Sequence, residues 1–149
     1  MKELILIVTF TFISLASYGQ SNPEDLIKKF FNDYPKNSNQ AIDNLYATNK
    51  WTANIKDGIS NMKKEVNGYT EDYMGKYYGY ELITKKNCTE NFVLYSYMVK
   101  YDRQPLKFVF EFYRPNGTWV LFSLDINATI DDDVEQVAKL FYYLDTEKK

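Results

Sequence analysis

The sequence predicts an α+β fold in which three N-terminal helices pack on a curved antiparallel four-stranded meander, with a further helix at the C-terminus. Two observations carry this prediction. Apolar residues recur at helical spacing up to about residue 66, and from Tyr80 onward the apolar period changes to two. Four strand-like runs then follow one another through short turns. Such short connections require antiparallel neighbours, because parallel strands need long crossovers.

The helical half has recognisable starts and stops. Asn22 can cap a first helix, Pro23 suits its first turn and Pro35 ends it. A second helix is expected to be capped by Ser38 or by the residue that follows it. We expect Asn67-Gly68 to end a third helix in a left-handed cap. The apolar stripe of that third helix comprises Ile55, Ile59, Met62 and Val66.

The strand-like runs span residues 80–87, 91–101, 106–114 and 118–127. Asn116-Gly117 lies between the last two runs and is a strong hairpin signal. A final amphipathic helix is expected over residues 131–144, because three aspartates precede its apolar stripe. Alternation predicts one helix-facing side for each of the last two strands, formed by Leu106, Phe108, Phe110 and Phe112 and by Val120, Phe122, Leu124 and Ile126.

The first nineteen residues have the pattern of a secretory signal peptide. Lys2 precedes an apolar run that is too short to cross a membrane, and small residues at Ser17 and Gly19 suit cleavage before Gln20. We therefore expect an exported protein, periplasmic or extracellular after cleavage, without stable membrane insertion. Residues 20–149 are long enough for one domain with a sizeable core.

Composition excludes several chemistries. The net charge is −2 and the lysines are scattered, so nucleic acid is not an expected partner. Cys88 is the single cysteine, which excludes an intrachain disulfide, and the absence of histidine excludes histidine-based triads and ordinary catalytic zinc sites. The stretch "DINATIDDDVEQ" imitates a calcium loop. It has Ile130 where glycine is needed and Gln136 where a bidentate glutamate is needed, so no metal and no cofactor is predicted.

The order of elements, with "PEDLIKKFFNDY", "AIDNLYATNKW" and "GKYYGYELI" preceding the meander, resembles the nuclear transport factor 2-like superfamily. The resemblance covers residues 23–127 and is closest to exported bacterial members. It implies an α+β cone that encloses a pocket, as in ketosteroid isomerases and polyketide cyclases. The predicted final helix lies beyond the usual core of that superfamily and bears on whether the pocket is open.

Two classes of function follow. The favoured one is a non-catalytic domain that binds a small ligand, sugar or peptide at the mouth of the cone, or that interacts with another protein. The alternative is a lyase or isomerase that uses tyrosine and a carboxylate. Glu111 and Asp125 are its candidate acids, but both occupy the polar phase of their strands and are expected to face outward.

The tyrosine-rich corner "YTEDYMGKYYGYELI" fits either the packing of a sharp turn or a ligand platform, since tyrosine combines an apolar ring with a polar hydroxyl. For the ligand platform, Tyr46 and Trp51 are expected to approach the corner. The predicted ligand-binding residues are Tyr46, Trp51, Tyr73, Tyr77 and Tyr78.

A homodimer is expected across the outer face of the sheet, because the strand over 91–101 is apolar on both phases. Covering of that face by the C-terminal helix of the same chain is the competing explanation. The predicted interface residues are Tyr95, Tyr97, Val109, Tyr113, Trp119 and Leu121.

Overall fold

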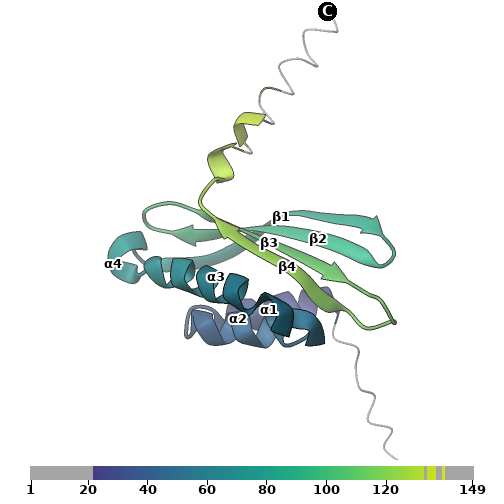
Figure 1. Cartoon of the computed structure of the whole chain (residues 1–149). Helices are drawn as coiled ribbons and strands as arrows, with labels where there is room; N and C mark the ends of the chain where they lie inside the picture. Colours follow the sequence, from purple (N-terminus) through teal and green to yellow (C-terminus); the bar gives the residue numbers. More distant parts are fainter. Residues whose placement is uncertain (1–21, 133, 137–138, 140–149) are drawn as a thin grey trace, which may run out of the picture.

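The computed structural model describes residues 22–132, 134–136 and 139. The fold is α+β, with several helices followed by an open four-stranded antiparallel meander of order β1-β2-β3-β4. Figure 1 shows α1, α2 and α3 together against one face of the sheet. The elements are α1 (Pro23–Asp33), α2 (Ser38–Tyr46), the 3-10 helix η1 (Lys50–Ile55), α3 (Lys56–Gly68), α4 (Glu71–Met74), β1 (Tyr77–Thr89), β2 (Phe92–Tyr101), β3 (Leu106–Tyr113) and β4 (Val120–Asn127).

The first two helices begin at asparagine caps. The Asn22 side chain accepts a hydrogen bond from the backbone N–H of Asp25 at 2.8 Å, as predicted for α1. Asn37 accepts from the backbone N–H of Gln40 at 2.9 Å, so α2 is capped one residue earlier than Ser38. Both helices bury apolar side chains, among them Phe30 of α1 and Ile42 of α2.

The predicted left-handed cap at Gly68 is wrong. The left-handed glycine at this corner is Gly75, with φ of 76°, and it follows the single-turn helix α4. The chain continues from Gly68 through Tyr69 with negative φ, because Thr70 caps a further turn before the strand begins. The reversal therefore occurs seven residues later than the Asn-Gly signal indicated.

Aromatic side chains join α1 to the middle of the sheet. Phe30 packs edge-on against Phe110 with ring centroids 5.3 Å apart, and Phe31 stacks on Tyr80 at 3.9 Å. The helix-facing side of β3 is as predicted and is fully buried. Its members are Leu106, Phe108, Phe110 and Phe112, each with 0% exposure.

The prediction for β4 is wrong at its first half. A register shift between Glu111 and Phe112 marks a bulge, which places Leu121 opposite Phe112 and turns Phe122 outward with 57% exposure. The N–H of Leu121 donates to Thr48 Oγ1 at 3.0 Å, and its carbonyl accepts from Asn49 Nδ2 at 2.9 Å. The segment after α2 thus covers the edge of β4 at the bulge.

The predicted interface patch does not lie on one face. Tyr95 and Leu121 are buried, at 2% and 1% exposure, and Tyr97 packs edge-on against Phe31 at 5.3 Å. Trp119 also packs against the helix-side core. The assignment of Tyr95, Tyr97, Trp119 and Leu121 to an outward surface is therefore wrong, because the phase of β2 that carries Tyr95 and Tyr97 faces α1. Val109 and Tyr113 are not among the residues of this core.

Several predictions fall outside the described residues. The signal peptide and its cleavage point belong to this group, as does most of the C-terminal helix. The backbone is helical at residues 130–132, 134–136 and 139, and the remainder of the predicted span 131–144 is not described. In the part of the chain that is described, no helix combines the length and apolarity needed to cross a membrane.

Candidate functional site

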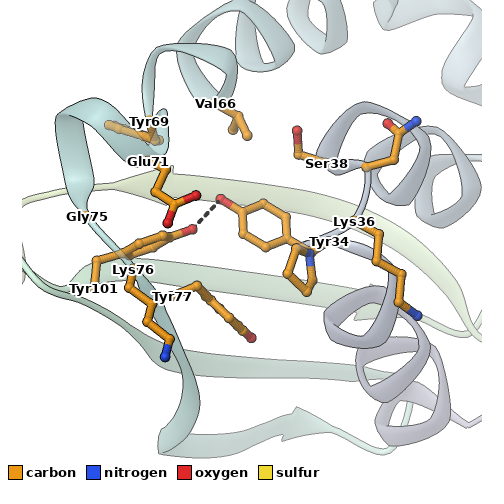
Figure 2. Close-up of a pocket in the computed structure, with 12 residues that line it drawn as sticks. Tyr34, Lys36, Ser38, Val66, Tyr69, Glu71, Gly75, Lys76, Tyr77 and Tyr101 are labelled. Atoms are coloured by element: carbon orange, nitrogen blue, oxygen red, sulfur yellow. Dashed lines mark hydrogen bonds between the residues drawn. The ribbon is translucent and has the colours of Figure 1, made fainter.

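A pocket of about 520 Å³ lies where α1 ends and β1 begins. We call it the tyrosine pocket. Residues from both helices and strands form its wall, and Figure 2 shows them coming from the C-cap of α1 and the turn after it, from α2, α3 and α4, and from β1 and β2. Its lining residues are Tyr34, Pro35, Lys36, Asn37, Ser38, Val66, Tyr69, Glu71, Gly75, Lys76, Tyr77 and Tyr101.

Local hydrogen bonds hold the corner that brings β1 to this pocket. The carboxylate of Asp102 accepts from the backbone N–H of Lys76 at 2.6 Å and from the hydroxyl of Tyr78 at 2.8 Å. The N–H of Arg103 donates to the carbonyl of Met74 at 3.0 Å. A Cβ at Gly75 would overlap the side chain of Asp102, so only glycine allows this close approach. The corner therefore positions Lys76 and Tyr77 at the pocket.

Two phenols share a hydrogen bond inside the pocket. The hydroxyl of Tyr101 donates to that of Tyr34 at 3.2 Å (Figure 2), and Tyr34 is only 5% exposed. The Tyr77 ring lies edge-on to Tyr101 at 5.7 Å. A pair of hydroxyls uses one of its two hydrogens internally, so the other can be donated to an outside acceptor. Among the described residues no further hydrogen bond to either hydroxyl occurs.

The phenols of this pocket keep their protons at neutral pH. Burial, reinforced by the neighbouring Tyr101, raises the pKa of Tyr34 far above its usual value. Burial also raises the pKa of Tyr77 to about 12. The pKa of Tyr69 rises to about 12 through burial and through its hydrogen bond to Glu65. The pocket therefore presents neutral hydroxyl groups beside apolar ring faces.

The five residues predicted to bind a ligand do not meet at one place. Tyr77 lines the tyrosine pocket. Tyr78 is 54% exposed, and Tyr73 is 50% exposed with its ring centroid 4.1 Å from the Arg103 guanidinium. Tyr46 lines a separate pocket of about 460 Å³ between α2 and α3, and Trp51 is 66% exposed on η1. Their roles in binding stay predictions.

Sequence reasoning missed two of the central residues. Tyr34 reads as part of the apolar stripe of α1 and Tyr101 as the last residue of a strand, so neither was assigned to a site. Their separation of 67 positions carries no local signal. The one available hint is that each precedes a break in its element, at Pro35 and at the turn that starts with Asp102.

A different cluster occupies the other end of α1. Glu24 Oε1 accepts from Lys85 Nζ at 2.6 Å and from the Tyr95 hydroxyl at 2.5 Å. A pocket of about 360 Å³ borders these three side chains and also Trp119. We call Glu24, Lys85 and Tyr95 the charged cluster. It ties the first turn of α1 to β1 and β2.

In the charged cluster the pKa of Glu24 is lowered and the pKa of Tyr95 is raised. Burial opposes the negative charge of Glu24, but the hydrogen bonds from Lys85 and Tyr95 outweigh it and lower the pKa of Glu24 below its usual value. Burial and the bond to Glu24 raise the pKa of Tyr95 to about 12. Glu24 is therefore an anion and Tyr95 a neutral donor over a wide pH range.

The two carboxylates considered for catalysis face outward, as predicted. Glu111 pairs with Leu94 and Ser123 and has the opposite phase to the buried phenylalanines of β3, and Asp125 is exposed. In the described ranges no three acidic or cysteine side chains are grouped so that they could hold a metal ion. Comparison of the chain with protein-family models, with curated proteins and with solved structures finds no match.

Proposed function

We propose that this protein is a non-catalytic domain that binds a small polar ligand, a sugar or a short peptide, in the tyrosine pocket. The observation that carries the proposal is the hydrogen-bonded pair of buried Tyr34 and half-buried Tyr101, whose second hydroxyl hydrogen is available to a ligand at a pocket of about 520 Å³. That volume lies within the range typical of small-molecule sites.

The chemistry of the pocket supports binding over catalysis. Its phenols have raised pKa values, so they hold their protons firmly and are poor acids and bases near pH 7. Neither Tyr34 nor Tyr101 is hydrogen-bonded to a carboxylate among the described residues. A hydroxyl that stays protonated is suited to donating a hydrogen bond to an acceptor group of a bound molecule.

A second candidate is a lyase or isomerase centred on the charged cluster, because Glu24 and Tyr95 form the direct tyrosine–carboxylate contact that such a reaction needs. The pKa shifts oppose it. Glu24 becomes a weaker base as its pKa falls, and Tyr95 becomes a weaker acid as its pKa rises. We therefore assign the charged cluster to anchoring of α1 and keep the tyrosine pocket as the functional site.

The proposal extends to cell location and fold family. Export after cleavage near Gly19 would place the pocket in the periplasm or outside the cell, where sugars and peptides are encountered. Membership of the nuclear transport factor 2-like superfamily is proposed on the order of elements alone. Mass spectrometry of the native mature protein should find a chain that starts at or near Gln20, and an intact Met1 would refute the export.

The binding proposal is tested by a screen of sugars and short peptides, using protein-observed NMR and soaked crystals. Ligands found in the screen should perturb the NMR signals of Tyr34, Tyr77 and Tyr101. Tyr77→Ala should lower their affinity at least about tenfold, because it removes a ring face from the pocket. Tyr113→Ala is the matched control, since Tyr113 is exposed on β3 and is not a lining residue of this pocket. Hits that ignore Tyr77→Ala would refute the assignment to this pocket.

A further inference from the structure

Two lysines line the tyrosine pocket, and neither forms an ion pair with a carboxylate of the described residues. In the described part of the chain, Lys63, Lys85 and Lys100 each form an ion pair with a carboxylate. No such pair involves Lys36 or Lys76 among those same residues. Both ammonium groups are therefore available to a partner that the described chain does not supply.

Asp102 contacts Lys76 through the backbone. The carboxylate of Asp102 is occupied by the backbone N–H of Lys76 at 2.6 Å and by the hydroxyl of Tyr78 at 2.8 Å. The ammonium group of Lys76 lies 5.6 Å from the centroid of the Tyr78 ring. Asp102 thus fixes the backbone of Lys76 and attracts its ammonium group, but no direct ion pair joins the two side chains among the described residues.

The charge of the pocket has the opposite sign to that of the protein. The lining holds two cations, Lys36 and Lys76, and one carboxylate, Glu71, whereas the whole chain has a net charge of −2. Figure 2 shows the ammonium groups on either side of Tyr77 in that view. Local positive charge in an acidic protein favours an anionic ligand at this place.

The neutral part of the lining suits a sugar ring. A pyranose has an apolar C–H face that can lie on a phenol ring and hydroxyl or ring oxygens that can accept the unused hydrogen of the Tyr34–Tyr101 pair. Tyr69 and Tyr77 add further rings with protonated hydroxyls. Ring faces, hydroxyl donors and unpaired ammonium groups thus occur together in one pocket.

We propose that the ligand of the tyrosine pocket is an acidic saccharide, meaning a sugar ring that carries a carboxylate. The ring packs on Tyr77 and accepts a hydrogen bond from the Tyr34–Tyr101 pair, and the carboxylate binds between Lys36 and Lys76. This inference rests on the proposed binding function and narrows its ligand class from sugar or peptide to uronic-acid sugars.

The test compares three probes on the full mature chain by isothermal titration calorimetry: trigalacturonic acid, the neutral maltotriose, and trialanine with a free carboxylate. Trigalacturonic acid should bind about tenfold or more tightly than maltotriose, and its affinity should fall when salt is raised from about 20 mM to about 500 mM, because salt screens exposed charges. Maltotriose binding should change little with salt.

Variants assign the preference to the two lysines. In Lys36→Gln/Lys76→Gln the affinity for trigalacturonic acid should fall to within about threefold of that for maltotriose, because both cations that would pair with its carboxylates are removed. Each exposed ion pair contributes modestly, so the double variant is used. Lys28→Gln is the control, since Lys28 is exposed on α1 and is not a lining residue of the pocket. These substitutions are at exposed positions and leave the core intact, so loss of folding does not obscure the result.

The outcomes separate the inference from the function on which it rests. Equal binding of the acidic and neutral sugars, or tighter binding of trialanine, overturns the acidic saccharide while a Tyr77-dependent pocket stands. An acidic preference that survives Lys36→Gln/Lys76→Gln also overturns it. A screen in which no sugar or peptide binds in a Tyr77-dependent way refutes the proposed function itself.

Discussion

At both ends of α1 a tyrosine of the sheet lies beside a residue of the helix or of its cap, yet the two ends differ in chemistry. At the N-terminal end Tyr95 donates to Glu24, which also accepts from Lys85. At the C-terminal end Tyr101 donates to Tyr34, another phenol. At the first end the hydroxyl hydrogen of Tyr95 is used by the Glu24 carboxylate. At the second end one hydroxyl hydrogen has no partner among the described residues. The two ends therefore differ in the partner of the tyrosine, more than in the tyrosine itself.

The same difference separates the anchoring role of the charged cluster from the binding role proposed for the tyrosine pocket. The charged cluster consumes its hydrogen bonds internally and fixes where α1 begins on the sheet. The tyrosine pocket depends on that fixed position, because α1 delivers Tyr34 to β2 from its far end. A rigid helix with one anchored end can present the other end to a ligand without rearrangement.

The largest effect is expected from a substitution that weakens the packing of α1 on the sheet, on which both ends depend. Phe31 is 2% exposed in the last turn of α1 and stacks on Tyr80 at 3.9 Å. Phe31→Ala should lower the free energy of unfolding by about 3–5 kcal/mol through lost burial and a cavity. Phe122→Ala is the control, since Phe122 is 57% exposed, and should lower it by less than about 1 kcal/mol. Urea titration measures both, and similar losses would show that α1 is not the common support.

The next effect appears only at alkaline pH and belongs mainly to the C-terminal end. Burial raises the pKa of Tyr34, so the folded state holds its proton more tightly than the unfolded chain does. Its stabilising contribution is complete below about pH 10 and is lost as the pH rises further, by up to about 1.4 kcal/mol per pH unit. Tyr34→Phe should therefore flatten the fall in stability between about pH 10 and pH 12.

Tyr113→Phe removes an exposed hydroxyl and serves as the control for that experiment. It should retain the alkaline fall of the parent protein, measured as the urea midpoint at each pH. If Tyr34→Phe and Tyr113→Phe had the same alkaline profile, the buried hydroxyl would not be the group that distinguishes this end of the helix.

A smaller effect is expected from a substitution that distorts only the corner beside the tyrosine pocket. Gly75 has φ of 76° and no space for a Cβ beside Asp102, so Gly75→Ala should lower the free energy of unfolding by about 1–2 kcal/mol and shift the NMR signals of Tyr77. Gly58→Ala is matched to it, because a Cβ at Gly58 in α3 would meet nothing within 4 Å and alanine favours the helix. If Gly75→Ala left the free energy of unfolding unchanged, the contact between Gly75 and Asp102 would not stabilise this corner.

The smallest effect concerns the charged end at acid pH. Hydrogen bonds lower the pKa of Glu24, so its contribution is present above the usual glutamate pKa and is lost as the pH falls through the lowered value. Half the side chain is exposed, and solvent screening limits this contribution to under about 1 kcal/mol. Glu24→Gln should reduce the acid fall in stability, followed by thermal unfolding between about pH 5 and pH 3. If Glu24→Gln left the fall in stability at acid pH unchanged, the Glu24 carboxylate would not stabilise the N-terminal end of α1.

Much of the architecture could be predicted from local pattern. The caps and breaks at Asn22, Pro35 and Gly117 depend on backbone preferences of single residues, which act whatever surrounds them. Strict alternation likewise placed the four inward residues of β3 correctly. In each case the signal and the structure that it determines lie within a few residues of each other.

Two of the errors, in β4 and in β2, arose where a distant segment decided the outcome. Alternation failed in β4 because Thr48 and Asn49, from the segment after α2, bind the backbone of Leu121 at a bulge that local period cannot reveal. The outward assignment of Tyr95 and Tyr97 failed because both phases of β2 are apolar, so only the docking of α1 selects the inner face.

The sequence by itself determined the α+β class, the order of helices before strands, the antiparallel meander and the exclusion of histidine and disulfide chemistry. Only the tertiary structure decided that Tyr34 meets Tyr101 and that Glu24 meets Tyr95, across separations of 67 and 71 residues. The physical reason is that backbone preference acts over one turn or one hairpin, whereas the partner of a buried hydroxyl is set by how a whole helix lies on the sheet.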